Sequence, residues 1–338
     1  MNRRLCLTMR PDADRHRVSR RNVLRCVVLA TGGMVTRGLM AQDQAPRIGL
    51  LAPGDRGEDI EGFMDGMREL GYVDGRNLSV VYREAKGRNE ALGPLLMEFV
   101  SLKVSVIVTG GTAAARTARQ MNLSTPVVIG AMTDPVESGV AMSLARPGGN
   151  ITGLSLATGD DFGGKYLELL SELRPGMRRV AVLYHLARPA ELQAMQREAP
   201  RFGIELVSMQ VGSKVELAES FQRIASQHID AAVVITDPFT FAERQRIIAL
   251  ASAKRLPVIY GLAAFVDAGG LLAYGPSLRE RWHRAATYVD KILKGAKPAE
   301  LAIEQPTRFE LVINAKTARE LGLTIPAMLG MRVDRVVN

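Results

Sequence analysis

The stretch VSVIVTGGTAA at residues 104–114 joins an apolar run, two glycines and the beginning of an alanine-rich segment. A short apolar run predicts a buried strand, glycines predict a tight turn, and the residue spacing that follows is typical of an amphipathic helix. We therefore expect a strand over 104–109 and a helix over 112–121. A strand that leads directly into a helix is the repeating unit of α/β folds.

The same alternation extends on both sides of this unit. Apolar runs predict further strands over 48–52, 78–82 and 126–131, and amphipathic patterns predict helices over 58–70 and 89–102. Strands that are apolar along their whole length and are separated by helices indicate a parallel sheet covered on both faces.

The series of strands begins again in the second half of the chain. Residues 179–183 (RVAVL) echo 47–51 (RIGLL) at an offset of 132, and 256–261 (LPVIYG) echo 125–130 (TPVVIG) at 131. Two matches in the same order and at nearly the same offset indicate an internal repeat. We predict an α/β fold with two doubly wound parallel-sheet lobes.

Three stretches are suited to carry the chain between the lobes. Two are rich in glycine, residues 147–153 and 269–276, and the third is a predicted strand at 307–313 that follows a predicted helix over 278–293. Three connections form a hinge, and a hinge between two α/β lobes makes a cleft that closes on a ligand. The predicted domains are 46–153 with 275–305 for the first lobe, and 154–274 with 306–338 for the second.

The first 41 residues have the pattern of an export signal. A twin-arginine segment at Ser19–Arg25 precedes an uncharged stretch at Cys26–Thr36, and the small residue Ala41 provides a cleavage position. The uncharged stretch is far shorter than the ~20 residues that span a bilayer. We expect a cleaved signal peptide, a periplasmic protein exported by the twin-arginine route, and no membrane segment after cleavage. A disordered basic tail on a cytoplasmic protein is the alternative.

Charge and cysteine content restrict the function of the remaining chain. The leader holds nine Arg against two Asp, so the net charge falls from +9 for the whole chain to +2 without it. This balance gives no support for a nucleic-acid partner. Both cysteines, Cys6 and Cys26, lie in the leader, so the chain after cleavage has no thiol for a disulfide, a metal or nucleophilic attack.

Five segments resemble a known family: 47–51, 69–77, 144–153, 288–298 and 309–314. In this order they resemble the substrate-binding proteins of ABC transporters, and more narrowly the branch associated with tryptophan and tyrosine transport. The resemblance covers about residues 46–336. It implies a type I periplasmic-binding fold, capture of a small solute between the lobes, and delivery to an ABC permease that works with a cytoplasmic ATPase.

Candidate ligand-binding residues follow the strand at 104–109. Ligands of open α/β sheets bind beyond the carboxyl ends of the strands, and a helix amino terminus attracts a carboxylate. We therefore assign Thr109, Gly111, Thr112 and Ala113 to the ligand site. The alternative is structural, with Thr112 as the helix cap and the glycines as a turn.

Two aspartates, Asp134 and Asp237, follow later strands and precede a proline. Either carboxylate could pair with a ligand ammonium group. The Asp-Pro sequence is equally typical of a helix start, so capping stays open for both residues.

Three tyrosines form the predicted aromatic wall that would stack on a planar ligand. Tyr184 follows one predicted strand, Tyr260 ends another, and Tyr274 lies in the second connection between the lobes. Packing within a lobe is the alternative for all three. The neighbouring His185 has no partner at metal-ligand spacing, and we predict neither a metal nor a cofactor.

Motifs for other activities are absent or incomplete. Residues 159–166 approach a phosphate-binding loop, but Tyr166 occupies the position where Ser or Thr should reach magnesium. There is no dinucleotide fingerprint and no nucleophile elbow. We expect a monomeric binding protein and not an enzyme. Its expected solute is small and bears a carboxylate: an amino acid, with an aromatic one as the leading candidate. The alternatives are an exported enzyme that uses Asp134 and Asp237 as acid and base, and a ligand-sensing module for a signalling partner.

Overall fold

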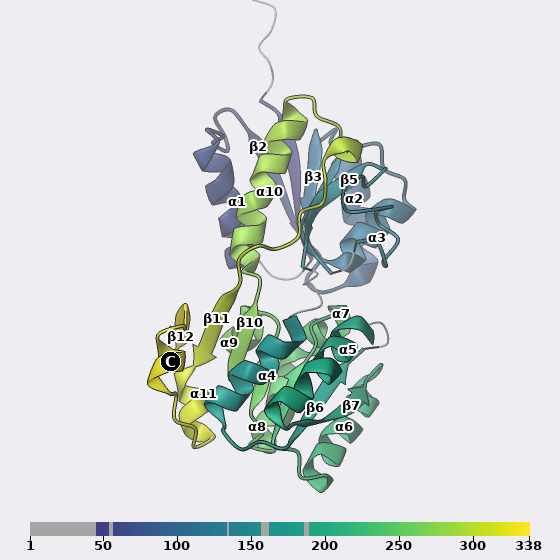
Figure 1. Ribbon diagram of the computed structural model, residues 1–338. Coiled ribbons are helices and arrows are strands. Elements are labelled where there is room, and N and C mark those ends of the chain that lie inside the picture. The colour runs from purple at the N-terminus through teal and green to yellow at the C-terminus, as the bar shows by residue number, and fades with distance from the viewer. Residues whose placement is uncertain (1–44, 54–56, 134, 157–161, 186–188) are drawn as a thin grey trace, which may run out of the picture. The chain divides into compact units, whose positions relative to one another are not determined.

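The computed structural model describes residues 45–53, 57–133, 135–156, 162–185 and 189–338. Residues 45–338 form one compact unit. It contains two sheets, one with five strands and one with seven (Figure 1). The predicted leader and Asp134 lie outside the described residues.

The first sheet is entirely parallel and has the order β2-β1-β3-β4-β5. Its strands are β1 (Arg47–Ala52), β2 (Ser79–Glu84), β3 (Val106–Thr109), β4 (Val127–Met132) and β5 (Ile151–Ser155). Its helices are α1 (Glu58–Glu69), α2 (Leu92–Ser101), α3 (Thr112–Gln120) and α10 (Leu278–Leu293), with a 3-10 turn η1 (Asn89–Ala91) before α2 and another, η3 (Pro298–Glu300), after α10.

Helices cover this sheet on both faces because its strands alternate between two cores. Ile48 and Leu50 face α1 and α10, whereas Leu51 faces α2 and α3. On the α1 side, Gly62 permits close approach to α10, since a Cβ there would lie 2.4 Å from the carbonyl oxygen of Arg279. The pairing of α1 with α10 therefore fixes a late segment of the chain to the first lobe (Figure 1).

The second sheet has the order β12-β11-β10-β9-β8-β6-β7 and is parallel except for the antiparallel pair β10–β11. Its strands are β6 (Arg179–Tyr184), β7 (Glu205–Gln210), β8 (Ala231–Val234), β9 (Val258–Tyr260), β10 (Leu272–Gly275), β11 (Glu310–Asn314) and β12 (Arg335–Val337). Its helices are α4 (Phe162–Leu173), α5 (Pro189–Glu198), α6 (Lys214–Ser226), α7 (Pro238–Ala242), α8 (Arg244–Ala253), α9 (Ala263–Asp267), α11 (Ala315–Glu320) and α12 (Ala327–Gly330), with a 3-10 turn η2 (Ala199–Phe202).

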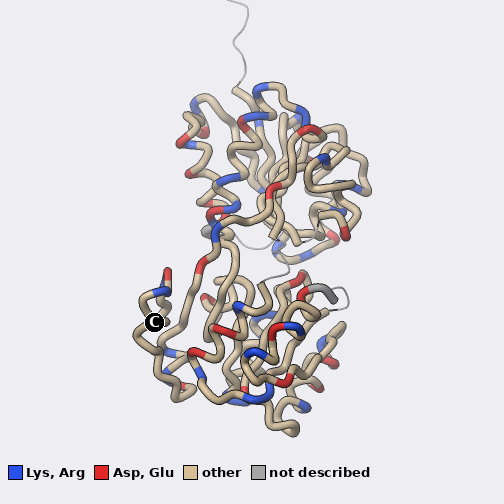
Figure 2. Tube along the Cα trace, in the orientation of Figure 1, with Lys and Arg blue, Asp and Glu red and all other residues tan. Residues whose placement is uncertain are grey.

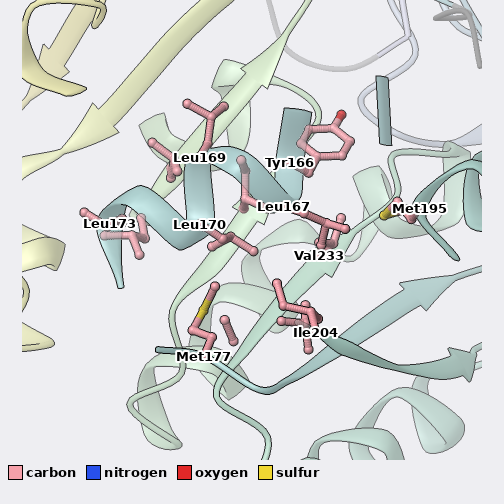
Figure 3. Packing of buried hydrophobic residues seen from close by; sticks show 14 of the residues in the cluster. Tyr166, Leu167, Leu169, Leu170, Leu173, Met177, Met195, Ile204 and Val233 are labelled. Atoms are coloured by element: carbon pink, nitrogen blue, oxygen red, sulfur yellow. The ribbon is translucent and has the colours of Figure 1, made fainter. Parts of the chain in front are cut away.

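The core of the second lobe is built in the same way. Leu167 and Leu170 of α4 are fully buried against the sheet, together with Met195 of α5 and Val233 of β8 (Figure 3). The opposite face of the sheet is covered by α6, α8 and α9. Two sheets, each with helices on both faces, confirm the predicted two-lobed α/β architecture.

The predicted strands and helices of the first lobe are confirmed with small shifts at their ends. The helix expected over 89–102 begins with the 3-10 turn η1 and continues as α2. One connection was misplaced by the sequence analysis. Residues 147–153 lead into β5, which pairs with β4, so the chain leaves the first sheet only after Ser155. No described helix is long and apolar enough to span a bilayer.

Candidate ligand-binding site

The last residue of β3 carries a buried hydroxyl group that lacks a partner within the described part of the chain. Thr109 ends β3 and is fully buried, and its Oγ1 atom has no hydrogen-bond partner among the described residues. Leaving a buried hydroxyl unpaired is costly, and such groups are therefore rare unless a ligand or water completes them. Thr109 thus remains a candidate for ligand contact.

Gly111, in the loop after β3, has a structural role in its backbone conformation and in its N–H group. Gly111 has a φ of +81°, a conformation that disfavours any side chain. Its N–H group donates to the carbonyl oxygen of Ala131 at 2.7 Å. The Gly111 N–H is therefore already paired within the first lobe, and ligand contact by Gly111 stays a prediction.

The amino terminus of α3 itself has no side-chain cap. Gly111 is the cap residue, and no side chain of the described chain accepts from the first-turn N–H groups. The capping role considered for Thr112 is thereby excluded, because Thr112 is the first helical residue. The N–H groups of Thr112, Ala113 and Ala114 remain directed out of the helix, at the positive end of its dipole.

A hydrogen bond joins the loops that follow β3 and β4. The Oγ1 atoms of Thr112 and Thr133 lie 2.7 Å apart, and either of them can donate. This contact brings Thr133, which the sequence analysis did not single out, to the uncapped end of α3. Asp134 follows Thr133 but lies outside the described residues.

Trp282, the single tryptophan of the chain, packs against the start of the loop after β3 and against the middle of β4. It lies on α10 and is almost fully buried. A methyl group at Gly110 or at Gly130 would lie 2.6 Å from its indole ring, so both positions require glycine. Sequence alone gives no sign of this contact, because Trp282 is more than 150 residues away from either glycine.

Asp237 has a clear structural role in the second lobe. Its Oδ1 atom accepts from the N–H groups of Phe239 and Thr240. In return, the Thr240 hydroxyl accepts from the Asp237 N–H. The same hydroxyl lies within donating distance of the carbonyl oxygens of Ile235 and Asp237. Its Oδ2 atom accepts from the N–H of His185 at 3.2 Å. Both carboxylate oxygens are therefore used within the lobe, which favours the capping alternative.

The three predicted tyrosines do not form one wall. Tyr184 is half-buried and packs against the hydrophobic core on the α4 side. Tyr260 is fully buried, and its ring stacks on Phe265 at 4.6 Å on the opposite face of the sheet. Burial raises the pKa of the Tyr260 hydroxyl well above its usual range. Tyr260 lines a small pocket of about 120 Å³ between α8, α11 and the glycines before β10. This pocket is separate from the loops after β3 and β4.

Tyr274 belongs to an aromatic cluster that the sequence analysis missed. Its ring stacks on Phe162 at 5.0 Å, and Phe309 packs against Phe162 at 4.7 Å. These residues lie beside three connections between the sheets: the start of α4, the end of β10 and the residue before β11. Partial burial raises the pKa of Tyr274, and the negative charge of Glu168 adds to this effect.

A second unpaired hydroxyl lies at the carboxyl end of β8. The Oγ1 atom of Thr236 is buried and has no partner among the described residues. A methyl group at Gly261 would lie 2.6 Å from this atom and 3.0 Å from the Tyr166 hydroxyl. Figure 3 shows the Tyr166 hydroxyl directed away from the leucines of α4. Each lobe thus places a threonine with an unpaired, buried hydroxyl at the end of its third strand in chain order.

The charges of the described chain do not gather at one site. Lys, Arg, Asp and Glu are interspersed over both lobes (Figure 2). Within the described ranges, no group of three His, Cys, Asp or Glu side chains could hold a metal ion.

Comparison with known proteins identifies the family. A family model described as ABC transporter substrate binding protein matches residues 53–337. The chain belongs to this family. This substrate-binding protein is also similar to the tyrosine-binding protein of Clostridioides difficile, with 24% identity over 266 residues that cover 78% of this chain and 76% of the relative.

Solved structures agree with this assignment. A conserved domain protein from Vibrio cholerae superposes with a TM-score of 0.74 and 25% identity, covering 87% of this substrate-binding protein and 100% of that chain. An ABC domain in complex with L-Trp from Streptococcus pneumonia superposes with a TM-score of 0.73 and 24% identity, covering 86% and 99%. The fold is thus a type I periplasmic-binding fold, as the sequence resemblance implied. Proteins of this family bind solutes and generally act outside the cytoplasm.

Proposed function

We propose that this protein is the periplasmic solute-binding component of an ABC importer, with an amino acid, most simply an aromatic one, as its solute. The observation that carries the proposal is the uncapped amino terminus of α3. There the N–H groups of Thr112 and Ala113 adjoin the Thr112–Thr133 hydroxyl pair. Such an arrangement is suited to a carboxylate, which accepts several hydrogen bonds at once.

Two similar proteins whose names give an aromatic solute support the aromatic class. One is named for tyrosine and the other was solved with L-Trp. In this chain, the aromatic cluster of Tyr274, Phe162 and Phe309 lies next to the connections between the sheets. An aromatic solute would add a further ring contact to such a cluster, and ring pairs contribute about 0.5–1.5 kcal/mol beyond the area they bury.

The proposed mechanism is closure of two lobes around the solute. The lobe built on the first sheet would bind the carboxylate, and the lobe built on the second sheet would then close over the remainder. Closure is favoured only by contacts that the solute makes in the closed state. An ABC permease would recognise the closed form and, together with its ATPase, complete transport. Monomeric action is part of this proposal.

The export route is a separate part of the proposal. Residues 1–41 would direct the folded protein through the twin-arginine pathway and then be removed. Replacing Arg20 and Arg21 by Lys should leave an uncleaved precursor in the cytoplasm, measured by fractionation and by mass spectrometry of the mature amino terminus. A periplasmic, cleaved product from the double variant would contradict this route.

The direct test of solute binding uses residues 42–338, which contain the whole compact unit. Thermal shift against L-tyrosine, L-tryptophan, L-leucine, sugars and nucleosides should show stabilisation by an amino acid. Solute at roughly 100 to 1,000 times its Kd raises the free energy of unfolding by about 2.7–4.1 kcal/mol. Calorimetry should give one site per chain, and chromatography of the mixture should recover the solute unchanged. Conversion of the solute would instead indicate the exported enzyme.

A further inference from the structure

A buried arginine lies where the chain passes between the two sheets. Arg281 on α10 is only 7% exposed. Its Nη2 atom donates to the carbonyl oxygens of Ser155, at 3.0 Å, and of Glu304, and its Nη1 atom donates to that of Gln305 at 3.3 Å. Burial lowers the pKa of Arg281, and the Glu304 carboxylate opposes this effect. Burying a guanidinium group is costly, so a fold that retains one needs these contacts.

The three carbonyl groups belong to two of the connections between the sheets, and Arg281 itself belongs to the third. Ser155 is the last residue of β5, from which the chain continues to α4. Glu304 and Gln305 precede β11. Arg281 lies one turn after Ser277, the cap residue at which the chain enters α10 from β10, and its N–H donates to the Ser277 carbonyl oxygen at 3.0 Å. One side chain therefore joins all three connections.

The first two of these connections are also paired with each other. The Ser155 N–H donates to the Glu304 carbonyl oxygen at 2.9 Å, and the Glu304 N–H donates to that of Gly153 at 3.1 Å. The segment around Glu304 thus extends the first sheet beside β5. Arg281 covers the end of this pairing, where the connections leave the first lobe.

The next residue along α10 contacts the candidate ligand site. Trp282 packs against Gly110 and Gly130, which hold the loops that carry Thr112 and Thr133. Arg281 and Trp282 are consecutive in one helical turn, so displacement of that turn would move both contacts together. A rigid helix that contacts two sites in this way is a physical route for coupling between them.

We propose that the first turn of α10 couples the ligand loops to the hinge, with Arg281 as the positioning residue that holds all three connections to the first lobe. This inference rests on the proposed function, since it assigns a device for the closure of the lobes on a solute.

The first arm of the test needs no ligand. Hydrogen exchange of the Ser155 and Glu304 amides is measured for the whole protein, for Arg281→Met and for Arg281→Lys. We expect exchange at these two amides to accelerate at least about tenfold in Arg281→Met, because the pairing opens locally. Arg281→Lys should be intermediate, since an ammonium group lacks the planar fork that reaches several acceptors.

Two control variants separate this role from a loss of general stability. Arg279→Met removes an exposed arginine of the same helix whose partner is Asp65. Val289→Ala opens a fully buried position of α10 about two turns beyond Arg281. Neither should change the exchange of Ser155 and Glu304 relative to other amides of the first sheet. Equal acceleration in Val289→Ala and Arg281→Met would overturn the proposal.

The second arm uses L-tyrosine as the probe. Small-angle scattering reports closure as a decrease in the radius of gyration, and the emission of Trp282 reports occupation of the ligand loops. Arg281→Met should keep the emission change, lose part or all of the compaction, and bind at least about tenfold more weakly. If this variant does not fold, Arg281→Lys and Arg281→Gln carry the same comparison.

The outcomes distinguish this inference from the proposed function. Compaction and affinity of Arg281→Met equal to those of the unaltered protein would overturn the coupling role of Arg281. Absence of any response of the unaltered protein to L-tyrosine would instead count against the proposed solute, and the exchange experiment would still decide whether Arg281 holds the connections.

Discussion

The hydroxyl oxygens of Thr112 and Thr133 lie 2.7 Å apart, although the two residues follow different strands. Their hydrogen bond joins the loops after β3 and β4 at the uncapped end of α3. A pair of hydroxyl groups can reorient so that one or both donate to an arriving anion. The first lobe therefore presents backbone and side-chain donors together, without an acidic side chain of the described chain capping the helix.

Replacement of Thr112 by Val should weaken binding of a carboxylate-bearing solute. The variant removes the hydroxyl but keeps the shape, and loss of a hydrogen bond to a charged group costs about 1–3 kcal/mol. Calorimetry gives the change in Kd. Thr117→Val is the matched control, because the Thr117 hydroxyl donates to the Ala113 carbonyl oxygen within the same helix. Equal affinities for both variants would contradict a role of Thr112 in binding.

Replacement of Thr109 by Val should separate stability from binding. The Thr109 hydroxyl is buried without a partner in the described structure, so its removal should leave the free energy of unfolding unchanged or raise it. If the hydroxyl donates to the solute, affinity should fall at the same time by about 1–3 kcal/mol. Urea unfolding and calorimetry measure the two quantities. Unchanged affinity would assign the hydroxyl to packing or to a bound water.

Replacement of Gly130 by Ala should destabilise the ligand-free protein. The new methyl group would lie 2.6 Å from the Trp282 ring, and overpacking of this kind costs about 1–3 kcal/mol. Urea unfolding measures the loss, and a red shift of the Trp282 emission should accompany it. Gly93→Ala in α2 is the control, since its nearest neighbour would be 4.0 Å away. That variant should be neutral or more stable by up to about 1 kcal/mol.

Replacement of Asp237 by Ala should lower stability and leave solute affinity within about twofold. The carboxylate caps α7 and accepts from the His185 N–H, and loss of a cap costs about 0.5–2 kcal/mol. Thermal unfolding measures the first effect and calorimetry the second. An affinity loss of tenfold or more, with stability unchanged, would restore Asp237 to the ligand site.

The sequence predicted the lobes because apolar strand runs and glycine-bounded loops are local signals. The alternation of strand residues also held information about Tyr260 that the analysis did not use. Val258 and Tyr260 share one face of β9 and Ile259 the other, so Tyr260 belongs with the core under α8 and α9. A tyrosine at the end of a strand does not by itself indicate a ligand wall.

Other parts of the site depend on contacts between distant segments. Trp282 meets Gly110 and Gly130 only after α10 has returned to the first lobe, and Arg281 meets Ser155 and Glu304 in the same way. Contacts between residues so far apart in the sequence leave no local pattern from which they could be predicted. The position of the first connection was predicted wrongly for a related reason. The glycine-rich stretch 147–153 leads into β5, and the pairing of β5 with β4, which no local signal indicates, keeps the chain in the first sheet.

The central claim is that the amino terminus of α3 binds the carboxylate of an amino acid. The most direct measurement compares L-tyrosine with tyramine, which differs only by lacking the carboxylate, in calorimetric titrations of residues 42–338. The account predicts saturable one-to-one binding of L-tyrosine and a loss of affinity of at least about 100-fold for tyramine, since the uncapped donors would remain unpaired. Equal binding of both compounds would contradict it.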